Sequence, residues 1–235
     1  MQPENTRAST NAPVCIGIIM DGNRRFARER SMPVMEGHRL GYEKAKEVAK
    51  WCKGAGIRYL ILYAFSTENW DRSPEEVSFL IGISKTLLLS EIDELRNENG
   101  AARFIGDIDR FGADFAAQAR QLETTNPVEP AMTVVIALSY GGRQEILNAV
   151  NQIIATKDKN QVTEKEFAQH LWTAGVPDPD LIIRTGGEMR LSNFLPWQGV
   201  YSELFFTDTY WPAFTEEEFN GILKLYGQRD RRMGK

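Results

Sequence analysis

Apolar segments of strand length alternate with amphipathic segments of helix length along most of the chain. Most of the strand-length segments are apolar at nearly every position, which is typical of parallel strands covered on both faces. We expect strands at 14–20, 59–65, 102–105, 133–138, 181–183 and 204–206. We expect helices at 40–53, 74–97, 110–124, 143–155, 164–172 and 216–228. The alternation predicts a single α/β domain with a central, mostly parallel six-stranded sheet flanked by helices.

The expected helix at 74–97 is apolar around more than one face. Phe79, Leu80, Ile83 and Leu87 are among the residues that widen its stripe. A helix that packs on one side only shows a narrower stripe. Burial on both sides is one interpretation. In the other, one face packs on the sheet while another lines an apolar cavity.

The first expected strand stops abruptly at polar residues. Asp21, Gly22 and Asn23 follow the apolar run, and Arg24 and Arg25 come directly after them. Glycine lets backbone approach a ligand, the start of a helix attracts phosphate, and a carboxylate can hold a divalent cation against that phosphate. This layout is typical of an anion site. A polar strand-to-helix turn without a ligand is the other interpretation.

Two further polar clusters follow later strands. The earlier one consists of Ser66, Thr67, Glu68, Asn69, Trp70, Asp71 and Arg72. A hydrogen-bonded loop with Trp70 covering the core is the alternative interpretation there. The later cluster begins with Arg184 and ends with Arg190, Leu191 and Ser192. Arginine forks match phosphate oxygens, and open parallel sheets bind ligands beyond the carboxyl ends of strands. Three such clusters indicate a diphosphate site more strongly than any one of them.

Two isolated residues leave their roles open. Glu203 directly precedes an apolar run, and an acid at the edge of a buried strand needs a partner. It pairs with an arginine or binds a metal. His38 stands alone between Gly37 and Arg39, and a lone histidine is more often structural than catalytic. The absence of GxxxxGKS and GxGxxG segments gives no indication of the common nucleotide-binding folds.

Composition narrows the class of protein. A chain of 235 residues that is 42% hydrophobic is enough for one good-sized core, and a net charge of −4 gives no reason to expect a nucleic-acid partner. Residues 1–12 are polar and lack an apolar h-region, so we expect a disordered leader before a domain at 13–235. Cys15 and Cys52 are interpreted as small buried residues in a reducing compartment, which favours a cytoplasmic location.

Several ordered segments resemble the cis-prenyltransferase family, typified by undecaprenyl diphosphate synthase. They include Met-Asp-Gly-Asn-x-Arg at 20–25, Tyr-Ala-Phe-Ser-Thr-Glu-Asn-Trp-x-Arg at 63–72 and Ser-Tyr-Gly-Gly-Arg at 139–143. Ile-Ile-Arg-Thr-Gly-Gly-Glu-x-Arg-Leu-Ser-Asn-Phe at 182–194 and Tyr-Ser-Glu-Leu-Phe-Phe at 201–206 complete the pattern. The resemblance covers nearly the whole chain.

The resemblance implies an enzyme that condenses isopentenyl diphosphate onto an allylic diphosphate such as farnesyl diphosphate. The expected product is a cis-polyprenyl diphosphate, a precursor of an undecaprenyl-like lipid carrier. An apolar tunnel between the sheet and two helices would hold the growing tail. The resemblance also implies Mg²⁺ as cofactor, a homodimer, and peripheral membrane contact during product release.

The residue roles follow from the same resemblance. Asp21, Asn69 and Ser66 are the implied catalytic residues, and Asp21 and Glu203 the implied metal ligands. The implied substrate contacts are Gly22, Asn23, Arg24, Arg25, Phe26, His38, Ser66, Thr67, Glu68, Trp70, Arg72, Arg184, Arg190, Leu191, Ser192, Arg232 and Gly234. The last two belong to a C-terminal Arg-x-Gly tail that reaches the neighbouring subunit's site in this family.

Four positions depart from the family pattern. Many members have histidine at the position of Cys15, arginine at Val34, tryptophan at Phe26 and histidine or glutamine at Met189. Methionine is a poor ligand for Mg²⁺, which prefers oxygen. These departures leave the substrate preference open. A short-chain synthase, an irregular prenyl-coupling enzyme and a non-catalytic partner subunit are the alternatives, although the retained aspartate and arginines argue against the last.

Overall fold

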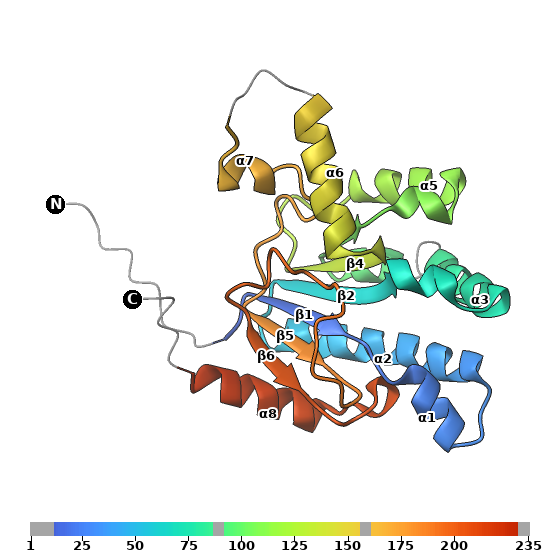
Figure 1. Cartoon of the computed structure of the whole chain (residues 1–235). Coiled ribbons are helices and arrows are strands. Elements are labelled where there is room, and N and C mark those ends of the chain that lie inside the picture. The colour runs from blue at the N-terminus through green and yellow to red at the C-terminus, as the bar shows by residue number, and fades with distance from the viewer. Residues whose placement is uncertain (1–11, 87–91, 156–160, 230–235) are drawn as a thin grey trace.

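The computed structural model describes residues 12–86, 92–155 and 161–229, and its centre is a six-stranded sheet (Figure 1). The strands are β1 (Cys15–Ile19), β2 (Tyr59–Ser66), β3 (Gly100–Ile105), β4 (Met132–Tyr140), β5 (Leu181–Arg184) and β6 (Glu203–Phe206). Their order is β3-β4-β2-β1-β5-β6, and every pairing is parallel. The predicted α/β fold with its parallel sheet is confirmed.

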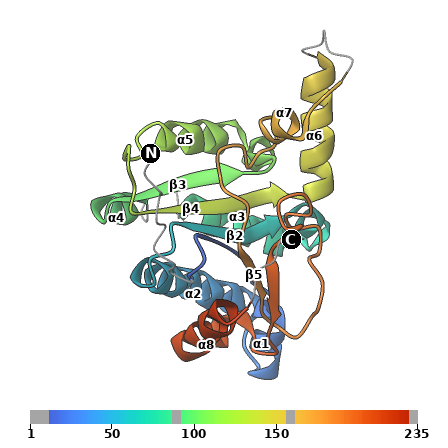
Figure 2. The ribbon, with the colours of Figure 1, turned by 90° about the vertical axis from the view of Figure 1, so that its left-hand side faces the viewer.

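Helices cover both faces of this sheet. They are α1 (Asn23–Glu29), α2 (Val34–Gly54), α3 (Pro74–Thr86), α4 (Ile92–Asn97), α5 (Ala113–Glu123), α6 (Gly142–Ala155), α7 (Glu164–Ala168) and α8 (Glu216–Gly227). Figure 2 shows α2 and α8 on one face and α5, α6 and α7 on the other. Short 3-10 helices span Thr67–Asp71, Ile108–Phe111 and Trp211–Ala213. None of the helices within the described ranges has the length and apolar character needed to cross a bilayer.

Helix boundaries differ from the prediction more than strand boundaries do. Helix α2 begins at Val34 rather than at 40, because its first turn packs on α1 through a glycine instead of a large apolar side chain. A Cβ on Gly37 would lie 2.3 Å from the carbonyl oxygen of Asn23. The expected helix at 110–124 is divided by Gly112, whose φ of 106° disfavours any residue with a side chain.

Parallel register brings the carboxyl ends of the strands to one edge of the sheet. Ile19 of β1 lies opposite both Tyr63 of β2 and Arg184 of β5. The polar segments that follow these strands therefore begin at the same edge. Residues 1–11, 87–91 and 230–235 lie outside the described residues, and with them most of the predicted leader, part of the expected helix at 74–97 and the Arg-x-Gly tail.

Candidate active site

The chain turns sharply after β1 and presents Asp21 at the sheet edge. Gly22 has a φ of 108°, and a Cβ there would lie within 2.9 Å of the backbone of Tyr210. The carbonyl oxygen of Asp21 accepts hydrogen bonds from the Trp211 N–H (2.9 Å) and the Thr185 hydroxyl (2.7 Å). Backbone on both sides thus fixes the position of the carboxylate.

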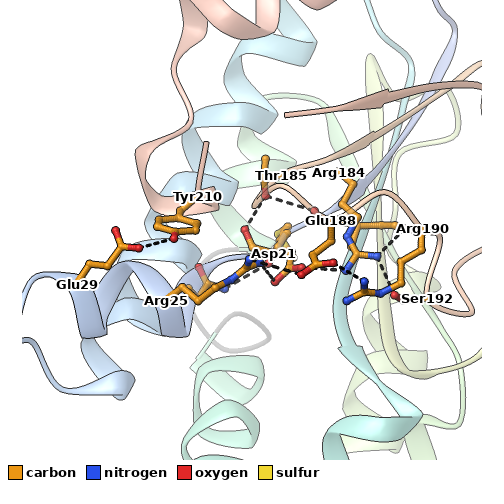
Figure 3. Close-up of polar contacts among 12 residues, drawn as sticks. Asp21, Arg25, Glu29, Arg184, Thr185, Glu188, Arg190, Ser192 and Tyr210 are labelled. Carbon is orange, nitrogen blue, oxygen red and sulfur yellow. Dashed lines mark hydrogen bonds and ion pairs between the residues drawn. The ribbon is translucent and has the colours of Figure 1, made fainter. Parts of the chain in front are cut away.

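The carboxylate of Asp21 lies between two arginines from different clusters (Figure 3). Its Oδ2 accepts a 2.9 Å hydrogen bond from Nη2 of Arg184, and its Oδ1 lies 3.2 Å from Nη2 of Arg25. Arg184 is buried, and its Nη1 donates to the Ser192 hydroxyl (2.7 Å) and to the carbonyl oxygen of Arg190 (2.5 Å). The clusters after β1 and β5 therefore form one charged site.

Glu188 extends this site. Its carboxylate accepts a hydrogen bond from the guanidinium of Arg190 and lies 3.8 Å from Nη1 of Arg25. Glu188 is partly exposed, so both arginines remain open to solvent. The sheet edge thus gathers guanidinium groups that suit an anion with several oxygens, and carboxylates that suit a cation.

A buried carboxylate on α3, that of Glu76, contacts one histidine and two arginines. Glu76 is 5% exposed, and its Oε1 lies 2.9 Å from Nε2 of His38 and 2.7 Å from Nη1 of Arg72. Its Oε2 lies 3.7 Å from Nε of Arg24. Burial raises the pKa of Glu76, but the hydrogen bond from His38 and the charges of Arg72 and Arg24 outweigh burial and leave that pKa below its ordinary value.

His38 is therefore held inside the protein. It is 7% exposed, and burial lowers its pKa even though its hydrogen bond to Glu76 acts in the opposite direction. The neutral imidazole ties α2 to α3 beside the site. On α1, the guanidinium carbon of Arg30 lies 3.8 Å from the centre of the Phe26 ring. Phe26 is half-buried.

The residues after β2 form a short turn at the same edge. Oδ1 of Asn69 accepts a 3.1 Å hydrogen bond from the Ser66 N–H, which closes the turn that Thr67 begins. Trp70 packs edge-on against Phe65, and its indole N–H donates to the Ser139 hydroxyl. Trp70 thus covers the core, while the Ser66–Asn69 turn is fixed at the rim.

Two apolar hollows lie between the sheet and the helices α2, α3 and α4. The hollow next to the charged site is lined by Met20, Asn23, His38, Gly41, Ala64, Leu80 and Ile83 among others. The distant one is lined by residues that include Ala49, Leu95, Ala102, Met132 and Val134. Tyr42, Ala45, Leu62 and Ile136 line both, so the hollows adjoin. Helix α3 lines a cavity, and burial on both of its sides is the wrong interpretation.

The structure does not bring Glu203 to Asp21 within one chain. Glu203 begins β6 opposite Leu181, whereas Arg184 ends β5, so Glu203 lies three residues from the carboxyl edge, or roughly 10 Å along the strand. Its Oε2 lies 3.8 Å from Nε of Arg229. The arginine-pair interpretation holds within one chain, because strand direction places the first residue of β6 toward the opposite edge. The described residues contain no group of three potential metal ligands.

Of three further site residues, two carry no clear signal in the sequence. Glu76 reads as an ordinary acid in the first turn of a helix, and Tyr210 as part of a loop. Tyr210 lies under Arg25, with 5.3 Å between the guanidinium carbon and the ring centre. Glu188 is the exception, because it stands between two arginines of the third cluster and its spacing was a usable signal.

Solved structures share this fold over nearly their full length. Lavandulyl diphosphate synthase from Lavandula x intermedia, in complex with dimethylallyl diphosphate, is 33% identical with a TM-score of 0.90, and the match covers 96% of this chain and 99% of that one. A probable undecaprenyl diphosphate synthase from Campylobacter jejuni is 31% identical with a TM-score of 0.79, over 95% and 99%. The fold and the charged edge beside an apolar cavity thus define an enzyme of the prenyl diphosphate synthase class.

Sequence comparison places the chain within that class. Residues 19–234 match the family model described as "Putative undecaprenyl diphosphate synthase". An isoprenyl transferase from Chromobacterium violaceum is 44% identical over 223 residues, covering 95% of this chain and 88% of the relative. Another from Thermotoga maritima is 43% identical over 225 residues, covering 94% and 97%. The chain belongs to the undecaprenyl diphosphate synthase family of prenyltransferases.

Proposed function

We propose that this enzyme condenses isopentenyl diphosphate onto an allylic diphosphate, such as farnesyl diphosphate, to make a cis-polyprenyl diphosphate of undecaprenyl type. The observation that carries the proposal is the meeting of two arginine-rich clusters at Asp21, beside an apolar cavity. One cluster suits each diphosphate, and the cavity suits the tail. A cytoplasmic location belongs to the same proposal.

The residues divide into two subsites. Arg184, Arg190 and Ser192 bind the diphosphate of isopentenyl diphosphate. Arg24 and Arg25, with the backbone of Gly22 and Asn23, bind the allylic diphosphate, and Phe26, Trp70, His38 and Arg72 border it. Leu191, Thr67 and Glu68 complete the rim between the subsites.

The reaction breaks the allylic carbon–oxygen bond and forms a carbon–carbon bond to isopentenyl diphosphate, which then loses a proton. Negative charge develops on the leaving diphosphate, and prearranged arginines stabilise it most effectively in a site shielded from water. Ser66 and Asn69 are fixed at the rim by the hydrogen bond that closes their turn. They orient the reacting carbons, and Asn69 lies next to the proton that leaves.

Asp21 suits Mg²⁺. Its carboxylate is 30% exposed at the rim of the site, and Mg²⁺ in proteins binds one or two carboxylates together with substrate phosphates, which would take over the contacts with Arg25 and Arg184. When bound, the ion would neutralise charge on the allylic diphosphate. Glu203 has no place at this ion within a single chain.

The adjoining hollows support a growing tail. Burial of each CH₂ contributes about 0.8 kcal/mol, so each five-carbon unit gains about 4 kcal/mol in an apolar cavity. Because this gain accumulates with length, release of a long product limits turnover. The proposal includes peripheral contact with a membrane, because a membrane would take up the product tail when it leaves the cavity.

Exposed apolar residues support a homodimer. Leu147 and Ile154 on α6 are 61% and 57% exposed and share a helix face with Val150. Among the described residues β6 is an edge strand that pairs with β5 alone, and Leu204 on it is exposed. An unpaired edge strand and an apolar helix stripe both favour association.

Irregular coupling of two allylic diphosphates is the second candidate. The high structural similarity to lavandulyl diphosphate synthase favours it. The hollow more distant from the charged site argues for a longer tail than two five-carbon units require. A short-chain cis-prenyl synthase lies between these candidates, and a non-catalytic partner subunit is the remaining alternative.

One experiment separates the candidates. The purified enzyme is incubated with Mg²⁺ and isopentenyl diphosphate plus dimethylallyl, geranyl or farnesyl diphosphate, and separately with dimethylallyl diphosphate alone. Mass spectrometry of the products gives their length. We expect long-chain products that require isopentenyl diphosphate. A ten-carbon product from dimethylallyl diphosphate alone would establish irregular coupling, and no product in any reaction would overturn the proposed function.

A further inference from the structure

Asn193 occupies a strained position directly after the implied isopentenyl subsite. Its φ is 66°, and the neighbouring Ser192 has a φ of 48°. These values lie in the left-handed region, where asparagine is one of the best tolerated residues after glycine. The loop after β5 therefore folds back on itself at Asn193, and its amide points away from Arg184 toward other loops.

The polar groups of Asn193 contact two other loops. Its Nδ2 donates to Oε1 of Glu68 (3.2 Å) and to Oε1 of Gln144 (3.1 Å). Its Oδ1 accepts from the N–H of Arg143 (2.9 Å), and its backbone carbonyl accepts from the N–H of Gly142 (2.8 Å). One residue thus joins the loop after β5 to the start of α6 and to the turn after β2.

These loops approach so closely that glycine is required between them. A Cβ on Gly141 would lie 2.6 Å from the Thr67 hydroxyl and 2.7 Å from Nδ2 of Asn193. A Cβ on Gly142 would lie 2.0 Å from Cδ of Pro196. This close approach places Asn193 and Thr67 of the Ser66–Asn69 turn on either side of Gly141, so the side chain of Asn193 contributes to the spacing between the two loops.

We propose that Asn193 is a positioning residue that fixes the distance between the Ser66–Asn69 turn and the Arg190–Ser192 subsite. This inference rests on the proposed function, in which the turn orients the reacting carbons and the subsite holds isopentenyl diphosphate. Each substrate still binds when the link is broken, but the reacting atoms no longer meet well. A misplacement of about 1 Å costs roughly 100-fold in rate.

The negative charge of Glu68 allows the contact between Asn193 and Glu68 to be tested by substitution. Burial raises the pKa of Glu68, but hydrogen bonds from its own backbone, Ser66 and Asn193 outweigh it and hold that pKa below its ordinary value. Glu68 is therefore negative at neutral pH. Asn193→Asp keeps the left-handed backbone and the acceptor for Arg143, while placing a second carboxylate against Glu68.

The test compares steady-state kinetics of the wild type and Asn193→Asp in the condensation assay. We expect kcat to fall by about tenfold or more while KM for either diphosphate changes by less than about threefold, because orientation and not binding is lost. Asn220→Asp, an exposed asparagine of α8, is the matched control and keeps wild-type kcat. A wild-type kcat in Asn193→Asp, or a raised KM with unchanged kcat, would overturn the inference.

A charge-removing substitution of Glu68, the partner of Asn193, separates positioning from folding. Gln at 68 can donate to a carboxylate, so we expect Glu68→Gln to restore at least about fivefold of kcat to Asn193→Asp in a double-mutant cycle that includes the Glu68→Gln single variant. Additive losses would contradict the inference. If Asn193→Asp does not fold, Asn193→Gly, which keeps the left-handed backbone, replaces it with the same expected loss of kcat. An inactive wild type would defeat the proposed function, whereas an active wild type with active variants defeats only this inference.

Discussion

At the scale of single residues, Asp21 decides how the charged edge responds to ligands. Its carboxylate lies against the guanidinium groups of Arg184 and Arg25, so it competes with any anion for both of them. A cation bound to Asp21 would relieve this competition. Pyrophosphate affinity in the wild type should therefore rise when Mg²⁺ is added.

Asp21→Asn tests this role. The amide removes the negative charge, so we expect pyrophosphate to bind without Mg²⁺ at least as tightly as in the wild type, and Mg²⁺ to add little. Turnover should fall by at least about 100-fold, because charge on the leaving group is no longer neutralised by a metal. Calorimetry with and without Mg²⁺ measures the first effect. Asp109→Asn, at an exposed ion pair with Arg120, is the control. A variant that keeps both turnover and Mg²⁺ dependence would refute the assignment.

The buried His38 gives a pH dependence of stability whose sign is fixed. Burial lowers its pKa below 6.5, so as pH falls through this value the unfolded chain takes up a proton before the folded protein does. Stability is therefore present above pH 6.5 and is lost on acidification, by at most about 1.4 kcal/mol for each pH unit. The lowered pKa of Glu76 acts in the same direction below its ordinary 4.5.

His38→Gln isolates this contribution. We expect the free energy of unfolding, measured in urea at pH 7.5 and 5.5, to fall less on acidification in His38→Gln than in the wild type. Groups that do not contact His38 titrate equally in both proteins and cancel in the comparison, and both pH values lie above the ordinary pKa of its partner Glu76. A slope as steep in the variant as in the wild type would show that His38 titrates alike in the folded and unfolded chain.

At the scale of elements, the crossing of α1 and α2 sets where the arginines of α1 lie. Gly37 packs against the backbone of Asn23, and a Cβ there would come within 2.3 Å of the carbonyl oxygen. We expect Gly37→Ala to destabilise the protein by about 1–3 kcal/mol, a typical cost of overpacking. Gly54→Ala, at the open end of the same helix, should be neutral or stabilising by up to about 1 kcal/mol. Equal unfolding free energies for the two variants would show that the crossing is not tight.

The hollow next to the charged site should limit the length of the product. Ala64 on β2 lines it, and leucine at this position would fill space that the tail occupies. We expect Ala64→Leu to shorten the products found by mass spectrometry while leaving addition of the first isopentenyl unit intact. Ala155→Leu, at the exposed end of α6, makes the same change away from the hollow. An unchanged product profile in Ala64→Leu would count against a tail in this hollow.

The sequence predicts strands better than helices for a physical reason. Continuous apolar runs define buried parallel strands, and all six expected strands end within two residues of the observed ones. The start of α2 was missed because a glycine contact leaves no apolar period. Parallel register explains why the strand-end clusters meet. The ion pairs of Glu76 with His38 and Arg72 depend on how helices cross, which the residue pattern does not contain.

At the scale of the whole molecule, the residues proposed for catalysis and binding gather at one edge of the sheet, where the carboxyl ends of the parallel strands lie. Asp21, Arg184 and the Ser66–Asn69 turn lie at or beyond the carboxyl ends of strands, whereas Glu203 is the first residue of β6 and lies toward the opposite edge. The polar character of Glu203 alone gave no warning of this. The assignment of its position requires the order and direction of β5 and β6, which only the folded sheet supplies.

Association of two chains is the remaining question at this scale, and the α6 stripe offers the sharpest test of it. Leu147 is 61% exposed and lies in a stripe with Val150 and Ile154, and contiguous exposed apolar residues mark interaction surfaces. We expect Leu147→Glu to shift the protein from dimer to monomer in light scattering coupled to size-exclusion chromatography. Leu225→Glu makes the same change on α8, where leucine is 53% exposed, and should leave the dimer intact. Because unfolding would also alter the mass distribution, both variants must first show wild-type circular dichroism. If both remain dimers, the interface lies elsewhere, and if the wild type is a monomer the stripe has no partner in a second copy.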